Sequence, residues 1–321
     1  MQNSLSTEEM RMTLQYTDSS GETQYDTVTS LNFENASVIV SGSNENIGVL
    51  CGSMQGIASN ITVSGIVTAE DSKNVGGIIG FYNKSGNSSM VRLIGVVNVS
   101  GDSCVGGVVG SCNVSSRNYS NYTVTIESLE NSGSIKASGD YAGGLFGFMS
   151  YDEGNSYTVS MTGLKNTGDI SGKLYVGGLI GCGSTDNNSS CIKNSSSSAT
   201  IIAEAYAGCI AGKLGSIKID GCSNEGSSLA ATKYITDAGE KYAYVGGYVG
   251  RGYLISNCTN AVEINYISDG KYVGGIMGYT DAAGSTEMQN LKNTANISGS
   301  GYVGGIIVGN LIGADKIDEA E

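Results

Sequence analysis

Short apolar runs alternate with glycine, asparagine and serine along most of the chain, and one apolar run returns at a nearly constant interval. This run is a six-residue phrase of the type Val-Gly-Gly-Ile-Ile-Gly. Its nine copies begin at Ile47, Val75, Val105, Ala142, Val176, Ala207, Val245, Val273 and Val303, which are 28, 30, 37, 34, 31, 38, 28 and 30 residues apart. A unit of this length is one supersecondary element that buries its apolar face against its neighbours. The pattern therefore predicts a repeat architecture.

Further columns of residues keep register with the phrase. A tyrosine stands directly before it, at Tyr141, Tyr175, Tyr206, Tyr244, Tyr272 and Tyr302. An asparagine stands upstream, at Asn131, Asn166, Asn194, Asn224, Asn260 and Asn293. Two residues before the asparagine lies an apolar column, comprising Ile61, Leu93, Leu129, Leu164, Ile192, Cys222, Cys258 and Leu291. Stacked amides hydrogen-bond to each other and tyrosines in register stack, so we interpret both polar columns as structural ladders.

The apolar runs predict strands, because they are β-branched, lack a helical period and are bounded by turn residues. Three runs in each unit fit a three-sided coil. We predict an all-β, single-domain parallel β-solenoid, or β-helix, of about nine coils with 28–38 residues each. Adjacent glycines in the phrase indicate either positive φ or close approach of neighbouring coils.

The chain is expected to divide into three parts. Residues 1–46 form N-terminal strands or a cap and the first coil, residues 47–309 form the repeat solenoid, and residues 310–321 form an acidic, solvated tail. Extra residues of the longer units are expected as loops, at Ser111–Tyr122, Ser150–Tyr157, Ser184–Ser198 and Ser227–Lys241.

The composition argues against two classes of partner, nucleic acids and membranes. The 321 residues include 49 glycines but no proline, histidine or tryptophan, and the net charge is −13. Nucleic acids and anionic membranes attract basic surfaces, so neither is an expected partner. No run approaches about 18 consecutive apolar residues, so we expect no membrane insertion by a helix. The first residues lack a basic patch followed by an apolar run, so no signal peptide is expected.

The eight cysteines leave two alternatives open. Cys222 and Cys258 fall in one apolar column in adjacent coils, which places them within disulfide range. Two free thiols that pack as small apolar groups fit equally well. The other pairs lack zinc-ligand spacing and the chain has no histidine, so no metal site and no cofactor are expected.

Candidate glycosylation sites are the Asn-X-Ser/Thr sequons that fall in predicted loops. They are Asn83, Asn87, Asn113, Asn118, Asn121, Asn187 and Asn188.

With these columns aligned, the chain resembles the GLUG-type repeat family. The units that carry the resemblance are Leu164-Lys-Asn-Thr-Gly-Asp-Ile-Ser-Gly with Tyr175-Val-Gly-Gly-Leu-Ile-Gly, and Ile255-Ser-Asn-Cys-Thr-Asn with Tyr272-Val-Gly-Gly-Ile-Met-Gly. The likeness runs from Ile47 to Gly309. It implies a β-solenoid segment of bacterial surface proteins, adhesin-like molecules and some large secreted peptidases, in which the repeats are the stalk. It implies no catalytic residues.

Repetition and resemblance together favour a structural or adhesive extracellular β-solenoid without enzymatic activity: a surface stalk, an adhesin repeat region or a filament subunit. We expect a location outside the cell or at its surface, as a fragment or mature piece. The expected partners are a second copy end to end, or host or matrix carbohydrate or protein. The alternative is a carbohydrate-active β-helix enzyme or a carbohydrate-binding module. Its candidate carboxylates Asp140, Asp169 and Asp269 share no register, so solvated turn aspartates fit them better.

Overall fold

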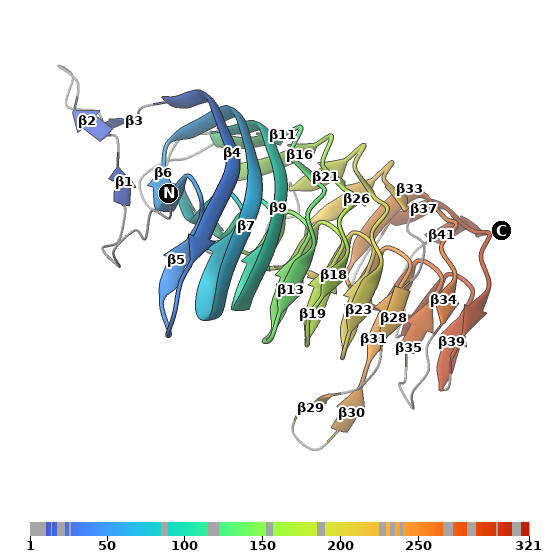
Figure 1. Cartoon of the computed structure of the whole chain (residues 1–321). Helices are drawn as coiled ribbons and strands as arrows, with labels where there is room; N and C mark the ends of the chain where they lie inside the picture. The colour runs from blue at the N-terminus through green and yellow to red at the C-terminus, as the bar shows by residue number, and fades with distance from the viewer. Residues whose placement is uncertain are drawn as a thin grey trace.

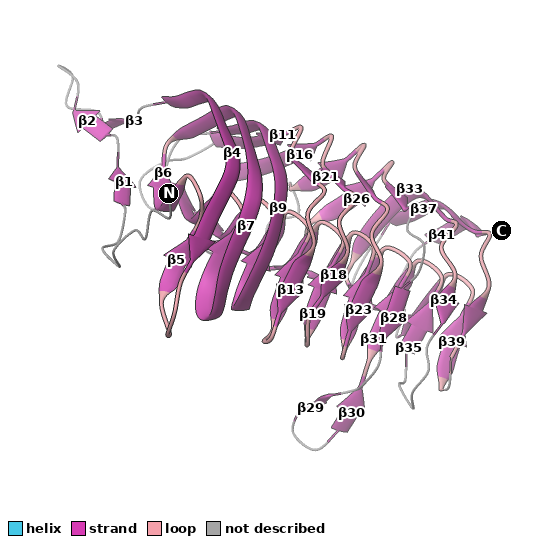
Figure 2. Ribbon diagram, viewed as in Figure 1, coloured by secondary structure: helices cyan, strands magenta, loops and turns pink. Residues whose placement is uncertain are grey.

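The strands follow one another in coils along a single axis, as Figure 1 shows from the blue to the red end of the chain. The computed structural model describes residues 11–13, 15–17, 23–25, 27–84, 89–114, 122–151, 157–184, 190–224, 229–231, 235–237, 240–265, 272–280, 287–299, 301–309 and 316–320. Within these ranges the secondary structure is strand, with no helix (Figure 2). No helix able to cross a membrane is therefore found in the described part of the chain.

One parallel sheet runs the length of the solenoid, with β1 as its first strand and one further strand from the end of each of the nine copies of the phrase. Its ten strands are, in order, β1 (Arg11–Thr13), β6 (Cys51–Gln55), β8 (Ile79–Lys84), β10 (Val109–Val114), β15 (Phe146–Tyr151), β20 (Ile180–Gly183), β25 (Ala211–Leu214), β32 (Val249–Arg251), β36 (Met277–Thr280) and β40 (Ile307–Gly309). Every neighbouring pair is in parallel register. The spacing of the phrase thus becomes the spacing of the strands.

The rest of each coil belongs to a second network of strands. Its first members are β4 (Thr27–Ile39), β5 (Glu45–Ile47), β7 (Ile57–Gly76) and β9 (Ser89–Gly106). After β9 the same path divides into four short strands, and β11 (Tyr122–Glu127), β12 (Glu130–Asn131), β13 (Ile135–Ala137) and β14 (Tyr141–Gly143) all pair with β9. Figure 1 shows that the long bent strands at the blue end are followed by shorter strands.

Later coils repeat this division. Their strands are β16 (Tyr157–Thr162), β17 (Lys165–Asn166), β18 (Ile170–Ser171), β19 (Tyr175–Gly177), β21 (Cys191–Lys193), β22 (Ser196–Ser197), β23 (Ile201–Ala203), β24 (Tyr206–Gly208), β26 (Lys218–Asp220), β27 (Ser223–Asn224), β28 (Leu229–Ala231), β31 (Tyr244–Gly246), β33 (Leu254–Asn260), β34 (Ile264–Asn265), β35 (Tyr272–Gly274), β37 (Glu287–Asn293), β38 (Ile297–Ser298), β39 (Tyr302–Gly304) and β41 (Lys316–Ala320). Two antiparallel hairpins stand apart: β2 (Gln15–Thr17) with β3 (Thr23–Tyr25), and β29 (Ile235–Asp237) with β30 (Glu240–Tyr242).

The molecule is an all-β parallel β-solenoid, so the predicted fold class is confirmed. It has about seven turns, slightly fewer than the nine coils expected.

The core is a line of apolar side chains inside the coils. One of its columns is buried from coil to coil and comprises Val67, Val99, Ile135, Ile170, Ile201, Leu229 and Ile264. Parallel pairing places each side chain on its equivalent in the next coil. A one-residue slip would turn the whole set outward, so the core fixes the register.

One corner of the solenoid has left-handed backbone at nine positions that are in register along the axis. Its residues have φ between 47° and 65°, and they are Ser30, Asn60, Arg92, Ser128, Gly163, Asn194, Gly221, Asn257 and Asn290. Glycine and asparagine tolerate this conformation best. The assignment of Asn194 to the asparagine ladder is therefore wrong, because Asn194 belongs to this corner. Ser197 takes the ladder position, in register with Asn166 and Asn224.

The expected loops and tail also need correction. Ser184–Ser198 contains β21 and β22, Ser111–Tyr122 begins within β10, and Ser150–Tyr157 begins within β15; parts of all three lie outside the described residues. Ser227–Lys241 contains β28 and most of the hairpin that projects from the rod in Figure 1.

The acidic tail, expected to be solvated, supplies β41, which pairs in parallel with β37. At the other end, β4 already pairs in register with β7, so the solenoid begins before residue 47.

Candidate functional site

A stripe of tyrosines along one side of the rod is the most extended surface feature. Parallel pairing sets the six in register. Successive rings are stacked with centroids 5.2, 4.6, 4.8, 5.1 and 5.3 Å apart, in the order Tyr141, Tyr175, Tyr206, Tyr244, Tyr272 and Tyr302. The stripe forms because each tyrosine is the first residue of its strand, and after five of the six the next residue is buried in the core.

Stacking decides what the stripe can offer to a ligand. The faces of each inner ring lie against its neighbours, and four of these rings are half-buried while Tyr244 is buried. Sugar rings and cations bind aromatic faces. The inner tyrosines therefore present edges and hydroxyl groups outward. Tyr141 and Tyr302 end the stack, each with one stripe tyrosine against it, and of these two Tyr302 is the exposed one, at 61%.

A second column flanks the tyrosines and was not anticipated from the sequence. It consists of the residue that follows the last glycine of each phrase, and it includes Phe148, Cys182, Lys213, Arg251 and Tyr279. The Lys213 ammonium lies 5.8 Å from the Tyr175 ring centre, and the Arg251 guanidinium lies 5.7 Å from that of Tyr279. Counting one residue beyond the phrase would have found this column.

A raised pKa keeps the hydroxyl groups of Tyr141, Tyr175 and Tyr244 in their neutral form. Burial is the main cause that raises the pKa of Tyr175 and of Tyr244, and the neighbouring Tyr206 adds to it in both cases. The Arg251 charge opposes this increase in pKa. Burial followed by the nearby Cys182 raises the pKa of Tyr141. At neutral pH the stripe therefore carries hydrogen-bond donors and two cationic neighbours.

The asparagine ladder lies inside the coil wall. The Asn131 Nδ2 donates to Asn166 Oδ1 at 2.8 Å and to the Gly133 carbonyl at 2.8 Å. Asn166 repeats the local bond with Gly168, at 2.9 Å. Ser197 occupies the next position, and a second run links Asn224 to Asn260 and Asn260 to Asn293, the latter at 2.7 Å. The first four of these asparagines are buried, so the amides satisfy turn backbone that water cannot reach.

The asparagine ladder explains why the third residue of the phrase is glycine. A Cβ on Gly107 would meet the Asn131 side chain and the Gly144 carbonyl of the next coil. Its φ is not in the positive range. Close approach of coils, rather than positive φ, is thus the reason for glycine at this position.

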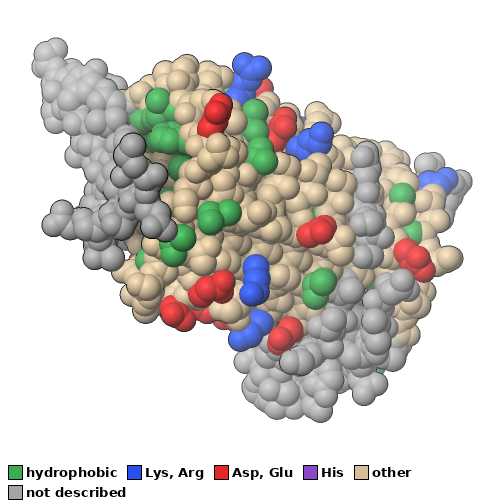
Figure 3. All heavy atoms as spheres, viewed as in Figure 1, with side chains coloured by type: hydrophobic (Ala, Val, Ile, Leu, Met, Phe, Trp, Pro, Cys, Tyr) green, Lys and Arg blue, Asp and Glu red, His purple; other side chains and the backbone are tan. Residues whose placement is uncertain are grey.

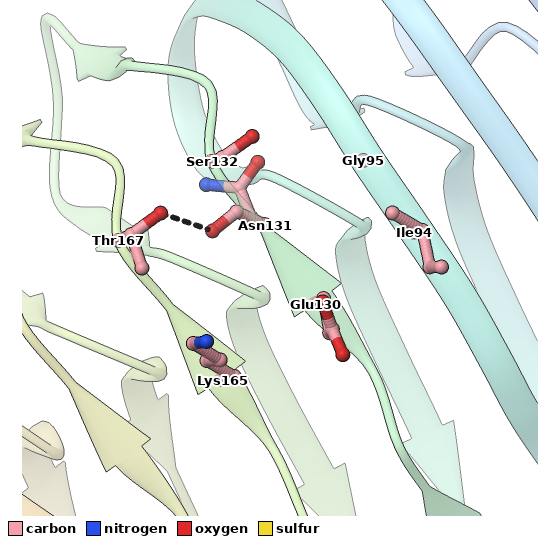
Figure 4. Close-up of a pocket in the computed structure, with 7 residues that line it drawn as sticks. All are labelled: Ile94, Gly95, Glu130, Asn131, Ser132, Lys165 and Thr167. Atoms are coloured by element: carbon pink, nitrogen blue, oxygen red, sulfur yellow. Dashed lines mark hydrogen bonds between the residues drawn. The ribbon is translucent and has the colours of Figure 1, made fainter.

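A small pocket opens where the ladder begins, and Figure 4 shows its lining. Gly95 stands in register with Asn131, so the asparagine amide has no equivalent in the preceding coil. The pocket has a volume of about 90 Å³ and is lined by Ile94, Gly95, Glu130, Asn131, Ser132, Lys165 and Thr167. Sites for organic ligands measure roughly 300–1,000 Å³, whereas a water takes about 30 Å³. The pocket therefore has room for a few waters.

The cysteines are free thiols in this structure, the second of the two alternatives. Cys222 and Cys258 are neighbours in adjacent coils, as their register partners show. Their Sγ atoms lie 3.5 Å from the Ile192 carbonyl and 3.1 Å from the Ser256 carbonyl. Burial raises the pKa of both thiols to about 12.

Two candidate glycosylation sites lie in strands rather than loops. Asn83 belongs to β8 and Asn113 to β10. The Ser150 hydroxyl donates to Asn113 Oδ1 at 3.0 Å, and the Asn113 amide lies 3.5 Å from Asn83 Oδ1. The expectation of loop positions is wrong for these two. The remaining sites lie outside the described residues: Asn87, Asn118, Asn121, Asn187 and Asn188.

Charged side chains are scattered over the face shown in Figure 3. The exposed Asp169 accepts a hydrogen bond at 2.9 Å from the Thr200 amide of the next coil, as a turn carboxylate does. Asp140 lies at the tyrosine corner beside Tyr141, and Asp269 lies outside the described residues. Among the side chains that the structure places, no group of three His, Cys, Asp or Glu could hold a metal ion.

The fold and these columns define a parallel β-solenoid with a tyrosine stack outside and an amide ladder inside. No protein-family model matches the chain, and neither a curated protein nor a solved structure matches it.

Proposed function

We propose that the chain is a non-catalytic structural and adhesive rod, displayed outside the cell or at its surface as a stalk or adhesin repeat region. The observation that carries this proposal is the repetition of one set of contacts from coil to coil. Tyrosine stacking, buried amide bonds and apolar core contacts recur along the axis. Repeat proteins gain length and surface by such nearest-neighbour contacts. The GLUG-type resemblance supports the same reading.

Surface display is testable on the cells that make the protein. Antibodies against the purified chain should label intact cells or their medium, and external protease should remove the label from intact cells. A cytoplasmic protein measured in parallel should stay protected. Labelling that requires permeabilised cells would contradict the proposal.

A structural role for the tyrosine stripe predicts a difference between two variants. Tyr206 stacks on both sides, at 4.6 and 4.8 Å, whereas Tyr302 has one stacking neighbour, at 5.3 Å. Each aromatic pair contributes about 0.5–1.5 kcal/mol beyond burial. Tyr206→Ala should therefore lower the free energy of unfolding by roughly 2 kcal/mol or more, and Tyr302→Ala by less, in urea denaturation. Equal losses of unfolding free energy in the two variants would argue against stabilisation by ring stacking.

Binding of an acidic carbohydrate is a second candidate, and the flanking cations favour it. Lys213 lies over the Tyr175 ring, and its register neighbour Arg251 lies over the Tyr279 ring, in a chain of net charge −13. Carboxylate or sulfate groups would meet donors and positive charge there. Binding to immobilised uronic-acid or sulfated glycans should fall in the Lys213→Ala/Arg251→Ala double variant, with the thermal midpoint little changed. Lys165→Ala, which removes a cation elsewhere, is the control.

A further inference from the structure

The tyrosine stripe is an unbroken row of side chains that can each lose one electron. Successive rings are inclined to each other by 7° to 30° and remain in van der Waals contact from Tyr141 to Tyr302. The chain has no tryptophan, so tyrosine and cysteine are its most readily oxidised side chains. An electron vacancy on one ring therefore has an equivalent ring beside it at every step.

The row meets two thiols at its N-terminal end. Cys104 holds the position before Tyr141 in the tyrosine column, because Ala142 pairs with Val105. Cys182 lies in the flanking column, one coil further along. Burial, then Cys182, then Cys104 raises the pKa of Tyr141, so both thiols lie close to this hydroxyl group. Cys182 also raises the pKa of Tyr175, after burial and Tyr206.

The two ends of the row differ in access and in chemistry. Before Cys104 the column continues with Asn74, whose amide donates to Asn46 at 2.9 Å, and an amide does not supply an electron. Cys182 is only 6% exposed and Cys104 is half-buried, whereas Tyr302 at the other end is 61% exposed. The row thus joins an accessible phenol to sheltered thiols.

We propose that the tyrosine stripe conducts single oxidising equivalents from the exposed Tyr302 to the thiols of Cys182 and Cys104. The reactant is a one-electron oxidant of the ferryl-haem or carbonate-radical class, which meets the open end of the row. The rod is then a radical relay, in which the oxidised centre forms several coils away from the oxidant. This activity goes beyond the proposed structural role and does not depend on the cellular location.

The steps balance in electrons and protons. The oxidant takes one electron from the Tyr302 phenol, whose proton passes to water, and a neutral tyrosyl radical remains. In each hop the next phenol gives an electron to the radical and loses its proton, while the radical regains one. In the last step the sulfur–hydrogen bond of a thiol breaks, its hydrogen atom restores the tyrosine, and a thiyl radical remains. Burial raises the pKa of Cys182 to about 12, so this hydrogen is in place at neutral pH.

The absence of histidine from the chain allows an oxidant to be placed at one end of the row. The exposed Ser298 precedes Tyr302 by four residues. In a Ser298→His variant of the full chain, the introduced imidazole binds a ruthenium(II) polypyridyl complex. Flash excitation with an irreversible cobalt(III) ammine quencher then produces ruthenium(III) beside Tyr302. A nitrone spin trap and peptide mass spectrometry locate the radicals.

Two conservative variants in this labelled background separate conduction from direct attack. Tyr206→Phe keeps a ring in the middle of the stack but removes the phenol that is oxidised. It should abolish trapping on Cys182 and Cys104 while radicals still form on Tyr302, Tyr272 and Tyr244. Tyr253→Phe removes a tyrosine outside the stripe, so trapping on the thiols should be unchanged. Circular dichroism melting confirms that both variants are folded.

The thiols are tested as the end point by a Cys104→Ser/Cys182→Ser double variant, in which the transient absorption of the tyrosyl radical should persist longer. An unchanged radical lifetime in this variant, thiol trapping that survives Tyr206→Phe, or a radical confined to Tyr302 would overturn the proposal. A surface-displayed chain with any of these results overturns this proposal alone. A chain that conducts but is confined to the cell interior overturns the proposed location alone.

Discussion

At the residue scale, the buried asparagines act as internal hydrogen-bonding partners for turns that have left regular pairing. Asn166 accepts from Asn131 at 2.8 Å and from the Gly168 amide at 3.3 Å, and it donates to the Gly168 carbonyl at 2.9 Å. The side chain has no exposed surface. One residue therefore satisfies its own turn and the coil before it.

Asn166→Ala should lower the free energy of unfolding by roughly 3 kcal/mol or more, because it leaves buried backbone groups of Gly168 without partners. Urea denaturation followed by circular dichroism measures the change. Asn98→Ala is the matched control, since the exposed Asn98 accepts from the Ser134 amide at 2.9 Å. We expect about 1 kcal/mol or less there. Equal losses in the two variants would refute a special role for the buried ladder.

At the element scale, the phrase brings neighbouring coils into backbone contact. Gly107 lies where Asn131 of the next coil needs space, and Gly275 stands in the same relation to Asn293. Gly305 holds the equivalent position in the last phrase and has no atom within 4 Å of a built Cβ. Positions 107 and 275 therefore have no space for a side chain, whereas position 305 has space for one.

Gly107→Ala should prevent stacking of adjacent coils and either abolish folding or lower stability by several kcal/mol, since overpacking costs about 1–3 kcal/mol even where side chains can shift. Gly305→Ala should leave the thermal midpoint nearly unchanged. Differential scanning calorimetry of the two variants measures both thermal midpoints. A tolerated alanine at position 107 would show that the coils can separate without loss of fold.

The sequence predicts some columns better than others, and the reason is their distance from the phrase. Each tyrosine adjoins the phrase, so no insertion can separate the two. The asparagine lies upstream of a variable stretch, and Ile192-Lys193-Asn194 imitates the apolar-any-asparagine pattern. Ser197 has the correct spacing of nine residues to Tyr206, as Asn166 has to Tyr175.

The left-handed corner gave only a weak signal in the sequence, because six of its nine positions hold asparagine or glycine and three do not. Its positions hold serine, asparagine, arginine and glycine. Only the backbone reveals them as one set, because the conformation, rather than a side-chain contact, is what they share. The solenoid class followed from periodicity, whereas this corner required the coordinates.

At the scale of the whole molecule, the rod encloses thiols along its core. Burial raises the pKa of Cys51, Cys182, Cys209, Cys222 and Cys258 to about 12. An unfolded thiol ionises with a pKa of about 8.5. Between these values the unfolded chain releases protons that the folded chain retains, so stability present at lower pH is lost as pH rises.

The free energy of unfolding should therefore fall between about pH 8.5 and pH 10, by up to about 1.4 kcal/mol per pH unit for each thiol above its unfolded pKa. Urea titrations at several pH values measure the slope. Cys209→Ala should reduce this slope by the share of one thiol. A stability that stays flat across the range would contradict the buried, protonated thiols.

The serine in the amide ladder has a consequence for how the rod holds together. Ser197 divides the ladder into a block at Asn131–Asn166 and another at Asn224–Asn293, while the tyrosine stack crosses the gap at its two shortest spacings. In a one-dimensional chain of coupled units, a boundary between folded and unfolded segments settles where coupling is weakest. We therefore expect that boundary at the Ser197 coil, where the stacking of Tyr206 bridges the two blocks of the ladder.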